Sequence, residues 1–462
     1  MVRSITLSLL CVVVLSASIG CSKSYSAFDN SLDGSSGGDL FADETPAPRA
    51  GLPKLTDESA IDDYVQYAAL NNPELAAAFN RWKADLQQIP QVTALPDPKF
   101  TYQYYIQQVE TRVGAQRQAF SIAQTFPWLG KLKLRGDAAA QAANASHQRF
   151  LQTKLKLARE VKDAYSEYYY LARAIEITRQ NAKLLEHIET IARIRYKTAA
   201  AGHPDITRVQ IELGKLADRV STLEEMRGPV VARLNAALNR PADTPVADAK
   251  EPQAGEIDID LVALDALLVA HNPEVAELDR QIAKEKVGIE LARKNYYPDV
   301  TLGMSYIDTA TSTGGRSPNG NGDDPVIAMV SINLPIWREK LDAGLRQARL
   351  RRQAATQTRA AKLNSLRSKL RLIVYRYSDA QRKIALYRDT LLPKARQAMT
   401  ATDAAYRGGK GGFLDLIDAQ RVLLEFEITL HRGIANRAQR LAELEMVTGV
   451  RPGPKETKGD KP

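Results

Sequence analysis

A set of landmarks that occurs twice in the same order constrains this chain more than any other feature. The shared landmarks are Asn72-Pro73-Glu74 with Asn272-Pro273-Glu274, Pro96-Asp97 with Pro298-Asp299, Phe126-Pro127-Trp128 with Leu334-Pro335-Ile336-Trp337, and the set Tyr196, Gly202, Asp205 and Gln210 with Tyr406, Gly412, Asp415 and Gln420. Self-similarity of this kind is the sequence signature of a repeated structural unit. We therefore interpret the chain as a tandem duplication whose copies, residues 55–240 and 258–449, are separated by a linker at 241–257.

Each copy is predicted to contain the same elements. Stretches rich in Ala, Leu and charged residues predict helices, whereas β-branched and aromatic residues on either side of a polar turn predict a hairpin. The expected order is a helix (about 58–93 and 258–293), a β-hairpin (98–126 and 299–335), a very long helix (about 131–202 and 338–408) and a last helix (about 205–240 and 413–449). The predicted fold class is mainly α with a small β part.

The two long helices restrict how the chain packs. Apolar residues recur along them at spacings of three and four, as at Leu363, Leu366 and Leu370, and helices of this length normally need a coiled-coil partner. The two shorter helices of a copy together match the long one, so we expect them to stack end to end along it. A helix of about 70 residues is about 105 Å long. Pro393 is expected to kink the second long helix or to unwind it locally.

The predicted strands raise a second constraint. The helical segments are too polar for lipid and no stretch approaches the roughly 18 apolar residues of a membrane-spanning helix, so the helices are expected in an aqueous space. A sheet that spans a membrane must close, and closure takes about eight strands or more. Four strands per chain therefore suggest that three chains form one twelve-stranded barrel. The alternative is a soluble hairpin that caps a helical bundle.

The N-terminus has the design of an export signal. Arg3 precedes the apolar run Ile5 to Leu15, and small residues lead into Cys21. Residues 1–20 are therefore predicted to be a signal peptide and Cys21 a lipidation site, although Ser18 departs from the usual larger aliphatic residue. The alternative is an ordinary signal peptide with an incidental Cys. Residues 21–54, rich in Ser, Gly, Asp and Pro, are predicted to be a flexible tether, and 450–462 a disordered tail.

Enzymatic, metal-binding and nucleic-acid-binding functions are not indicated. The chain has two Cys, at 11 and 21, and its five His form no spaced cluster, so no metal site or cofactor is predicted. Gly408 to Gly412 is rich in glycine and contains Lys410, but it lacks the Gly-Lys-Ser/Thr end of a phosphate loop. The net charge of +9 is spread along helix faces, and nucleic acid is a poor partner for an exported chain.

Two strings of residues resemble a known family. They are Gln124-Thr125-Phe126-Pro127-Trp128-Leu129-Gly130-Lys131 at the predicted strand-to-helix junction and, more specifically, Tyr406-Arg407-Gly408-Gly409-Lys410-Gly411-Gly412-Phe413-Leu414-Asp415-Leu416-Ile417-Asp418-Ala419-Gln420. With the duplicated element order, they resemble the outer-membrane efflux proteins, or TolC-like channels, over residues 55–450. The resemblance implies a homotrimer with a barrel in the outer membrane and a helical tunnel in the periplasm. It also implies docking of the tunnel tip on a periplasmic adaptor and an inner-membrane transporter.

The turns near 202–205 and 408–413 would form that tip, with Gly202, Gly409 and Gly412 in the turns. Asp415 and Asp418 share one face at a helix start, so in a trimer they would form carboxylate rings that favour cations. The alternative is that they only stabilise the helix N-terminus. Asp205 is followed by Arg208, which would instead pair with an Asp of the neighbouring turn. The resemblance also assigns Tyr406 to tip contacts.

The predicted function is therefore a passive outer-membrane exit duct for small solutes, drugs or metal ions, in a tripartite efflux system. Lipid anchorage and similarity to channels of resistance-nodulation-division pumps favour this over type I protein secretion. A periplasmic coiled-coil adaptor or scaffold is the alternative from another class. It would share the long helices but would need one helical hairpin with separate β domains.

The lipid anchor yields the first testable prediction. Changing Cys21 to Ala should leave folding and membrane association intact, because a single acyl anchor binds membranes only marginally and the pooled strands supply the main hold. Fractionation of cells that express the Cys21→Ala variant checks this. A variant recovered wholly in the soluble fraction would contradict it.

Overall fold

The computed structural model describes residues 52–56, 58–198, 202–253, 257, 259–312 and 319–453. These residues belong to one compact unit, Thr45–Pro462. The expected signal peptide, Cys21, most of the tether and most of the C-terminal tail lie outside the described residues.

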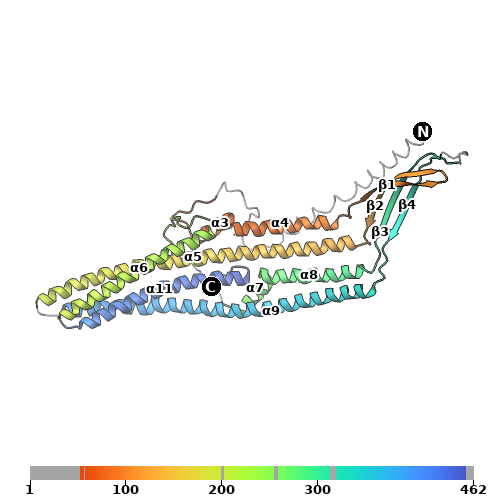
Figure 1. Ribbon diagram of the computed structural model, residues 1–462. Coiled ribbons are helices and arrows are strands. Elements are labelled where there is room, and N and C mark those ends of the chain that lie inside the picture. The colour runs from red at the N-terminus through yellow and green to blue at the C-terminus, as the bar shows by residue number, and fades with distance from the viewer. Residues whose placement is uncertain are drawn as a thin grey trace, which may run out of the picture. The chain divides into compact units, whose positions relative to one another are not determined.

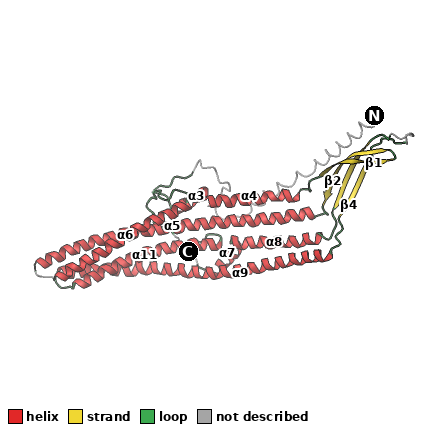
Figure 2. Cartoon of the chain, viewed as in Figure 1, coloured by secondary structure: helices red, strands yellow, loops and turns green. Residues whose placement is uncertain are grey.

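The described residues form helices and one small sheet, as expected for a mainly α chain (Figures 1 and 2). The elements of the first half are α3 (Ile61–Asn71), α4 (Pro73–Thr93), β1 (Lys99–Thr111), β2 (Gly114–Phe126), α5 (Lys131–Lys197) and α6 (His203–Ala237). Those of the second half are α7 (Leu261–His271), α8 (Pro273–Lys294), β3 (Val300–Thr309), β4 (Val326–Ile332), α9 (Arg338–Ala385), the π-helical turn η1 (Leu386–Leu391), α10 (Leu392–Arg407) and α11 (Phe413–Thr448). The order of elements is thus the same in the two halves.

The Asn-Pro landmarks break the first helix of each half, where the sequence predicted one continuous helix. Asn72 leaves the helical conformation (φ −76°, ψ 124°) because a following proline disfavours the α region. Its side chain accepts hydrogen bonds from the backbone N–H groups of Glu74 and Leu75, at 2.9 and 3.1 Å, and so begins a new helix. Asn272 does the same for α8.

The same two asparagines also connect distant parts of the chain. The Asn72 amide donates to the carbonyl oxygen of Ala237 at the end of α6, at 3.0 Å. The Asn272 amide donates to that of Val447 near the end of α11, at 2.8 Å. Each Asn-Pro landmark therefore fixes the place where the last helix of its half meets the break between the first two, end to end.

The two long helices, α5 and α9, make most of the contacts between helices. α5 packs against α4, α6, α8 and α11, and α9 packs against α8 and α11. Large side chains that are almost completely buried hold these contacts, among them Tyr165, Tyr168 and Tyr377. α5 is uninterrupted over 67 residues, whereas the second long segment contains the π-helical turn directly before α10, in which Pro393 is near the first position. No helix in the described ranges is both long and apolar enough to cross a bilayer.

The four strands form one antiparallel sheet in the order β1-β2-β3-β4, at the opposite end of the helices from the α5–α6 and α10–α11 turns (Figure 1). Paired residues on neighbouring strands share a face of a sheet. One face carries large apolar side chains that are mostly exposed, with Gln118, Gln124 and Asp308 as polar exceptions: Phe100, Tyr102, Ile122, Leu302, Met304, Tyr306, Val326, Val330 and Ile332. The other face is mainly small or polar: Thr101, Gln103, Ala119, Ser121, Ala123, Thr301, Gly303, Ser305 and Ser331, with Ile307, Ile327 and Met329 as exceptions.

A buried ion pair joins the sheet to the helices. The Lys131 ammonium, at the start of α5, donates to the Asp299 carboxylate at 2.7 Å and to the Tyr297 carbonyl at 3.0 Å. The Trp128 backbone N–H also donates to Asp299, at 2.8 Å, and the Trp128 ring stacks on Tyr297 with centroids 5.1 Å apart. Partial burial opposes ionisation of Asp299, but these donors outweigh it and hold its pKa below the ordinary value. The end of β2 and the start of β3 are thus fixed to one helix start.

This ion pair generates a stability prediction. Asp299→Ala leaves the ammonium of Lys131, whose side chain is only 5% exposed, without its charged partner, and should destabilise the fold by about 2–3 kcal/mol. Thermal unfolding in detergent measures the change. Asp137→Ala, which removes an exposed carboxylate from the first turns of α5, serves as the control. Equal melting temperatures for the two variants would contradict the assigned role.

Candidate functional site

The α10–α11 turn, at the end of the helices farthest from the sheet, is built largely from glycine. In the α10–α11 turn, the N–H groups of Lys410 and Gly411 both donate to the Ala405 carbonyl, at 2.9 and 3.1 Å, and close the end of α10. Gly409 has φ 71°, a left-handed conformation that favours glycine. A Cβ on Gly411 would approach Ala405 Cβ to 2.9 Å. The glycine run is therefore a tight reversal that the chain needs for steric reasons.

Tyr406 is the packing centre of this end. It is 2% exposed and lies in an apolar cluster that includes Ile188, Val209, Phe413 and Leu416. Its ring contacts that of Phe413 with centroids 5.6 Å apart. Its buried hydroxyl has no hydrogen-bond partner among the described residues, and burial, aided by the negative charge of Asp205, raises the pKa of Tyr406. Tyr406 therefore holds α10 against α5, α6 and α11.

Arg195 joins the end of α5 to Tyr406. Its guanidinium lies over the Tyr406 ring, 4.4 Å from the centroid, and also donates to the Tyr406 carbonyl oxygen. A cation over an aromatic face is stabilised by the ring quadrupole. The sequence did not single out Arg195, although it stands next to the landmark Tyr196. This contact couples the two long helices directly at the turns.

Asp415 and Asp418 are both exposed at the start of α11, as the shared helical face predicts. The Asp418 side chain is 80% exposed and lies 3.7 Å from the Arg421 guanidinium, at the limit of an ion pair. No ion pair joins Asp415 to any described residue. Asp415 is in the first turn of α11, but the cap residue is Gly412, which offers no side-chain bond. Two carboxylates are therefore available to solvent beside the glycine turn.

The α5–α6 turn differs in charge. Gly202 precedes α6, and Asp205 in its first turn pairs with Arg208 of the same helix at 4.0 Å. The expected pairing of Arg208 with an Asp of the neighbouring turn is not formed within one chain. Because Asp205 has a cation beside it, this turn presents less negative charge than the α10–α11 turn.

The most tightly bound charges at this end are ones that sequence reasoning missed. Glu212 of α6 is buried and accepts two hydrogen bonds from Arg421 of α11, at 2.5 and 3.2 Å, and one from Lys215. The Arg421 bond outweighs desolvation and holds the pKa of Glu212 below its ordinary value. A buried amide pair between Gln420 and Asn181, at 3.1 Å, joins α11 to α5. Of these residues, Gln420 alone belongs to the repeated landmarks, so it alone could be singled out from the sequence.

The described part of the chain contains no cluster of potential metal ligands. Across it, no group of three or more His, Cys, Asp or Glu side chains is close enough together to hold a metal ion. The His203 ring instead packs edge-on against Tyr196, with centroids 5.8 Å apart, and His187 contacts Arg407. The chemistry available at the turns is therefore electrostatic, from exposed carboxylates on a rigid apolar base.

Comparison with known proteins gives a family match over most of the chain. The family model described as outer membrane efflux protein matches residues 64–240 and 265–450. Among similar proteins, the cobalt-zinc-cadmium resistance protein CzcC of Cupriavidus metallidurans is 24% identical over 421 residues, 87% of this chain and 92% of that protein. Nodulation protein T of Rhizobium leguminosarum bv. trifolii is 21% identical over 406 residues, 84% of this chain and 85% of that protein.

Solved structures share the fold at lower identity. The outer-membrane channel OprN superposes with a TM-score of 0.71 and 16% identity, covering 89% of this chain and 95% of that one. CusC superposes with a TM-score of 0.70 and 14% identity, covering 90% and 99%. These likenesses establish the arrangement of helices and strands. They do not assign roles to individual side chains.

The ion pair between buried Glu212 and exposed Arg421 predicts a pH dependence at this end of the helices. Since the pKa of Glu212 is lowered on folding, its stabilising contribution is present above the unfolded pKa near 4.5 and is lost as the pH falls through the lower folded value. The protection factors of the α6 and α11 amides near this pair, which correct for the intrinsic exchange rate at each pH, should therefore fall below about pH 4.5. An Arg421→Gln variant should lose part of this acid dependence, because its Glu212 lacks the main partner. Identical pH profiles for the two proteins would contradict the assignment.

Proposed function

This chain belongs to the outer membrane efflux protein family and is an outer-membrane efflux channel, and on that premise we propose that three copies form one conduit. Three sheets of four strands would close a twelve-stranded barrel across the outer membrane. The helices of the three copies would continue the conduit as a tunnel in the periplasm. Solutes would pass through without chemical change, so the protein's work is to provide a lined, water-filled exit.

The exposed apolar face of the sheet is the observation that carries this proposal. Phe100 is 69% exposed, Tyr102 51% and Val330 71%, and water is a poor environment for such a face. The opposite face is small and mostly polar, which suits the wall of a water-filled pore. Strands β1 and β4 each have one unpaired edge in the single chain, and hydrocarbon does not tolerate unpaired backbone groups. Closure with other copies satisfies both requirements.

The helix turns are proposed to be the periplasmic tip, which docks on an adaptor protein and an inner-membrane transporter. The position of the turns at the far end from the sheet supports this, and so does the family membership of the chain. A lipid on Cys21, which lies outside the described residues, is proposed as a second membrane attachment. Domain limits at 55–240 and 258–449, as duplicated halves, are likewise part of the proposal.

The charge of the tip suggests what the conduit favours. In a trimer, exposed Asp415 and Asp418 would form rings of carboxylate that attract cations and resist anions. Asp205 would contribute less, since Arg208 is beside it. The relatives include proteins named for cobalt-zinc-cadmium resistance and for toxin and drug export, so the proposed cargo is small solutes, drugs or metal ions. A metal ion would be cargo in transit.

Single-channel recording in a planar bilayer tests the conduit and its tip together. The purified protein should insert and pass a cation-selective current. The double substitution Asp415→Asn, Asp418→Asn removes two charges per copy and should lower the cation-over-anion permeability ratio several-fold, by about 1 kcal/mol in relative barrier. The recording thus measures both the existence of the pore and the contribution of these carboxylates.

The matched control is Asp415→Glu, Asp418→Glu, which keeps the charges and should keep the selectivity. Unchanged selectivity in the Asn variant would exclude these carboxylates as the selectivity ring and leave them as helix-start residues. A protein that never conducts would overturn the conduit itself and favour a periplasmic adaptor or scaffold.

A further inference from the structure

We propose that β4 of one copy pairs with β1 of the next in a defined register, in which Ser331 lies opposite Thr101. The inference rests on the proposed function, because it presupposes that copies share one closed sheet. It goes beyond it by naming which residues meet at the seam between copies. The seam inside one chain, between β2 and β3, serves as the template.

The landmarks around the strands fix which residues of the two halves are equivalent. Pro96-Asp97 and Pro298-Asp299 precede β1 and β3, so Thr101 is equivalent to Gly303. Pro127 and Pro335 follow β2 and β4, so Ser121 is equivalent to Met329. The observed pairings agree with both assignments, since Thr101 pairs with Ser121 in the first hairpin and Gly303 pairs with Met329 in the second. The two hairpins therefore have the same register relative to the landmarks.

The internal seam then predicts the external one. Between β2 and β3, Ala123 pairs with Gly303. The equivalent of Ala123 is Ser331 and the equivalent of Gly303 is Thr101, so these two residues are opposite at the β4–β1 seam. The pairs on either side follow in the same way. They are Ile332 with Phe100, Val330 with Tyr102, and Met329 with Gln103.

The division of the sheet into two faces provides an independent check. Phe100 and Tyr102 lie on the apolar face of the chain's own sheet, and so do Ile332 and Val330. The proposed register places these side chains next to each other across the seam. A slip of one residue would put each apolar side chain opposite one from the polar face, because side chains alternate along a strand. The apolar band is continuous only if the slip is zero or an even number of residues.

The end of the seam nearest the helices repeats the pattern with apolar contacts. Inside the chain, Trp128 stacks on Tyr297. Their equivalents are Ile336 and Leu95, which are 65% and 47% exposed and so are available to a neighbouring copy. The equivalent of Lys131 is Glu339, so the internal ion pair is not repeated. Arg338 and Lys340, which flank Glu339, supply the positive charge that exposed Asp97 of the next copy would meet.

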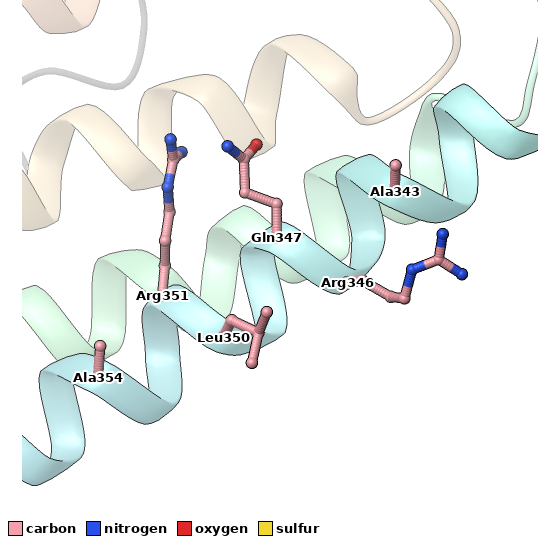
Figure 3. A pocket seen from close by; sticks show the side chains of 6 residues that line it. All are labelled: Ala343, Arg346, Gln347, Leu350, Arg351 and Ala354. Carbon is pink, nitrogen blue, oxygen red and sulfur yellow. The ribbon is translucent and has the colours of Figure 1, made fainter.

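The helix next to the seam has an unpartnered face of matching kind. Ala343, Gln347, Leu350 and Ala354 are exposed along α9 at alternating spacings of four and three, and with Arg346 and Arg351 they line a shallow groove (Figure 3). Such spacing marks the seam of a coiled coil. In α5, the equivalent of Ala343 is Arg135, which is exposed, whereas those of Gln347, Leu350 and Ala354 are Ala139, Ala142 and Ser146, which are partly or fully buried. A second copy therefore covers on α9 what the chain itself covers on α5.

Cysteine pairs test the register directly. Residues opposite each other on antiparallel strands have Cα atoms about 4.5–5.5 Å apart, within the range of a disulfide, whereas residues displaced by two are about 7–8 Å apart, at or beyond its limit. The double variants Thr101→Cys/Ser331→Cys and Gln103→Cys/Met329→Cys should form covalent dimers and trimers on mild oxidation in the outer membrane. The shifted combinations Thr101→Cys/Met329→Cys and Gln103→Cys/Ser331→Cys, made from the same four positions, should yield at least about fivefold less.

Bonds within one chain cannot imitate this result, since β1 and β4 lie at opposite edges of its sheet, about 14 Å apart. The parent chain without the introduced pairs controls for the natural cysteines. Higher yields from the shifted pairs would overturn the register, while the covalent trimers themselves would uphold the shared barrel. No cross-link in a protein of trimeric mass would overturn the β4–β1 seam. Monomeric mass for every variant and for the parent would overturn the proposed function as well.

Discussion

An outer strand of a sheet leaves half of its backbone N–H and C=O groups without partners. Both outer strands of this sheet also contribute exposed aromatic and aliphatic side chains to its apolar face. The apolar face calls for lipid, but lipid does not tolerate the open edges. Neither requirement can be met by the four strands of one chain. The constraint is satisfied when other copies add strands, and the remainder of the molecule follows from that need.

The connections between sheet and helices pass the constraint on to the long helices. Asp299 fixes the start of β3 to the start of α5, so copies that align their strands also align their helices. In the proposed trimer, the far ends of those helices would gather around the same axis. There Tyr406, Arg195 and the Glu212–Arg421 pair join the ends of the helices, and Asp415 and Asp418 are exposed beside these contacts.

The features that the sequence predicted correctly have a regular spacing of apolar residues or are bounded by turn residues. Apolar spacing predicted the long helices, and alternating residues between turn signals predicted both hairpins, although β1 and β2 extend further than expected. The Asn-Pro landmarks at Asn72 and Asn272 were recognised, but each was placed inside one helix because helical periodicity resumes directly after it. Arg195 and Arg421 were missed for another reason. An isolated arginine on a charged helix carries no local pattern, and its partner lies more than 200 positions away along the chain. Asp415 and Asp418 were predicted because a glycine turn marks their position; both are exposed, and their role stays a prediction.

The most direct test of the account is the mass of the complex extracted in detergent, measured by native mass spectrometry on the full chain. If other copies close the open edges of the sheet, the protein should be a trimer. Monomers should then appear only after denaturation. A folded monomer with the same helix and strand content would contradict the account, because its apolar sheet face and both strand edges would then be tolerated without partners.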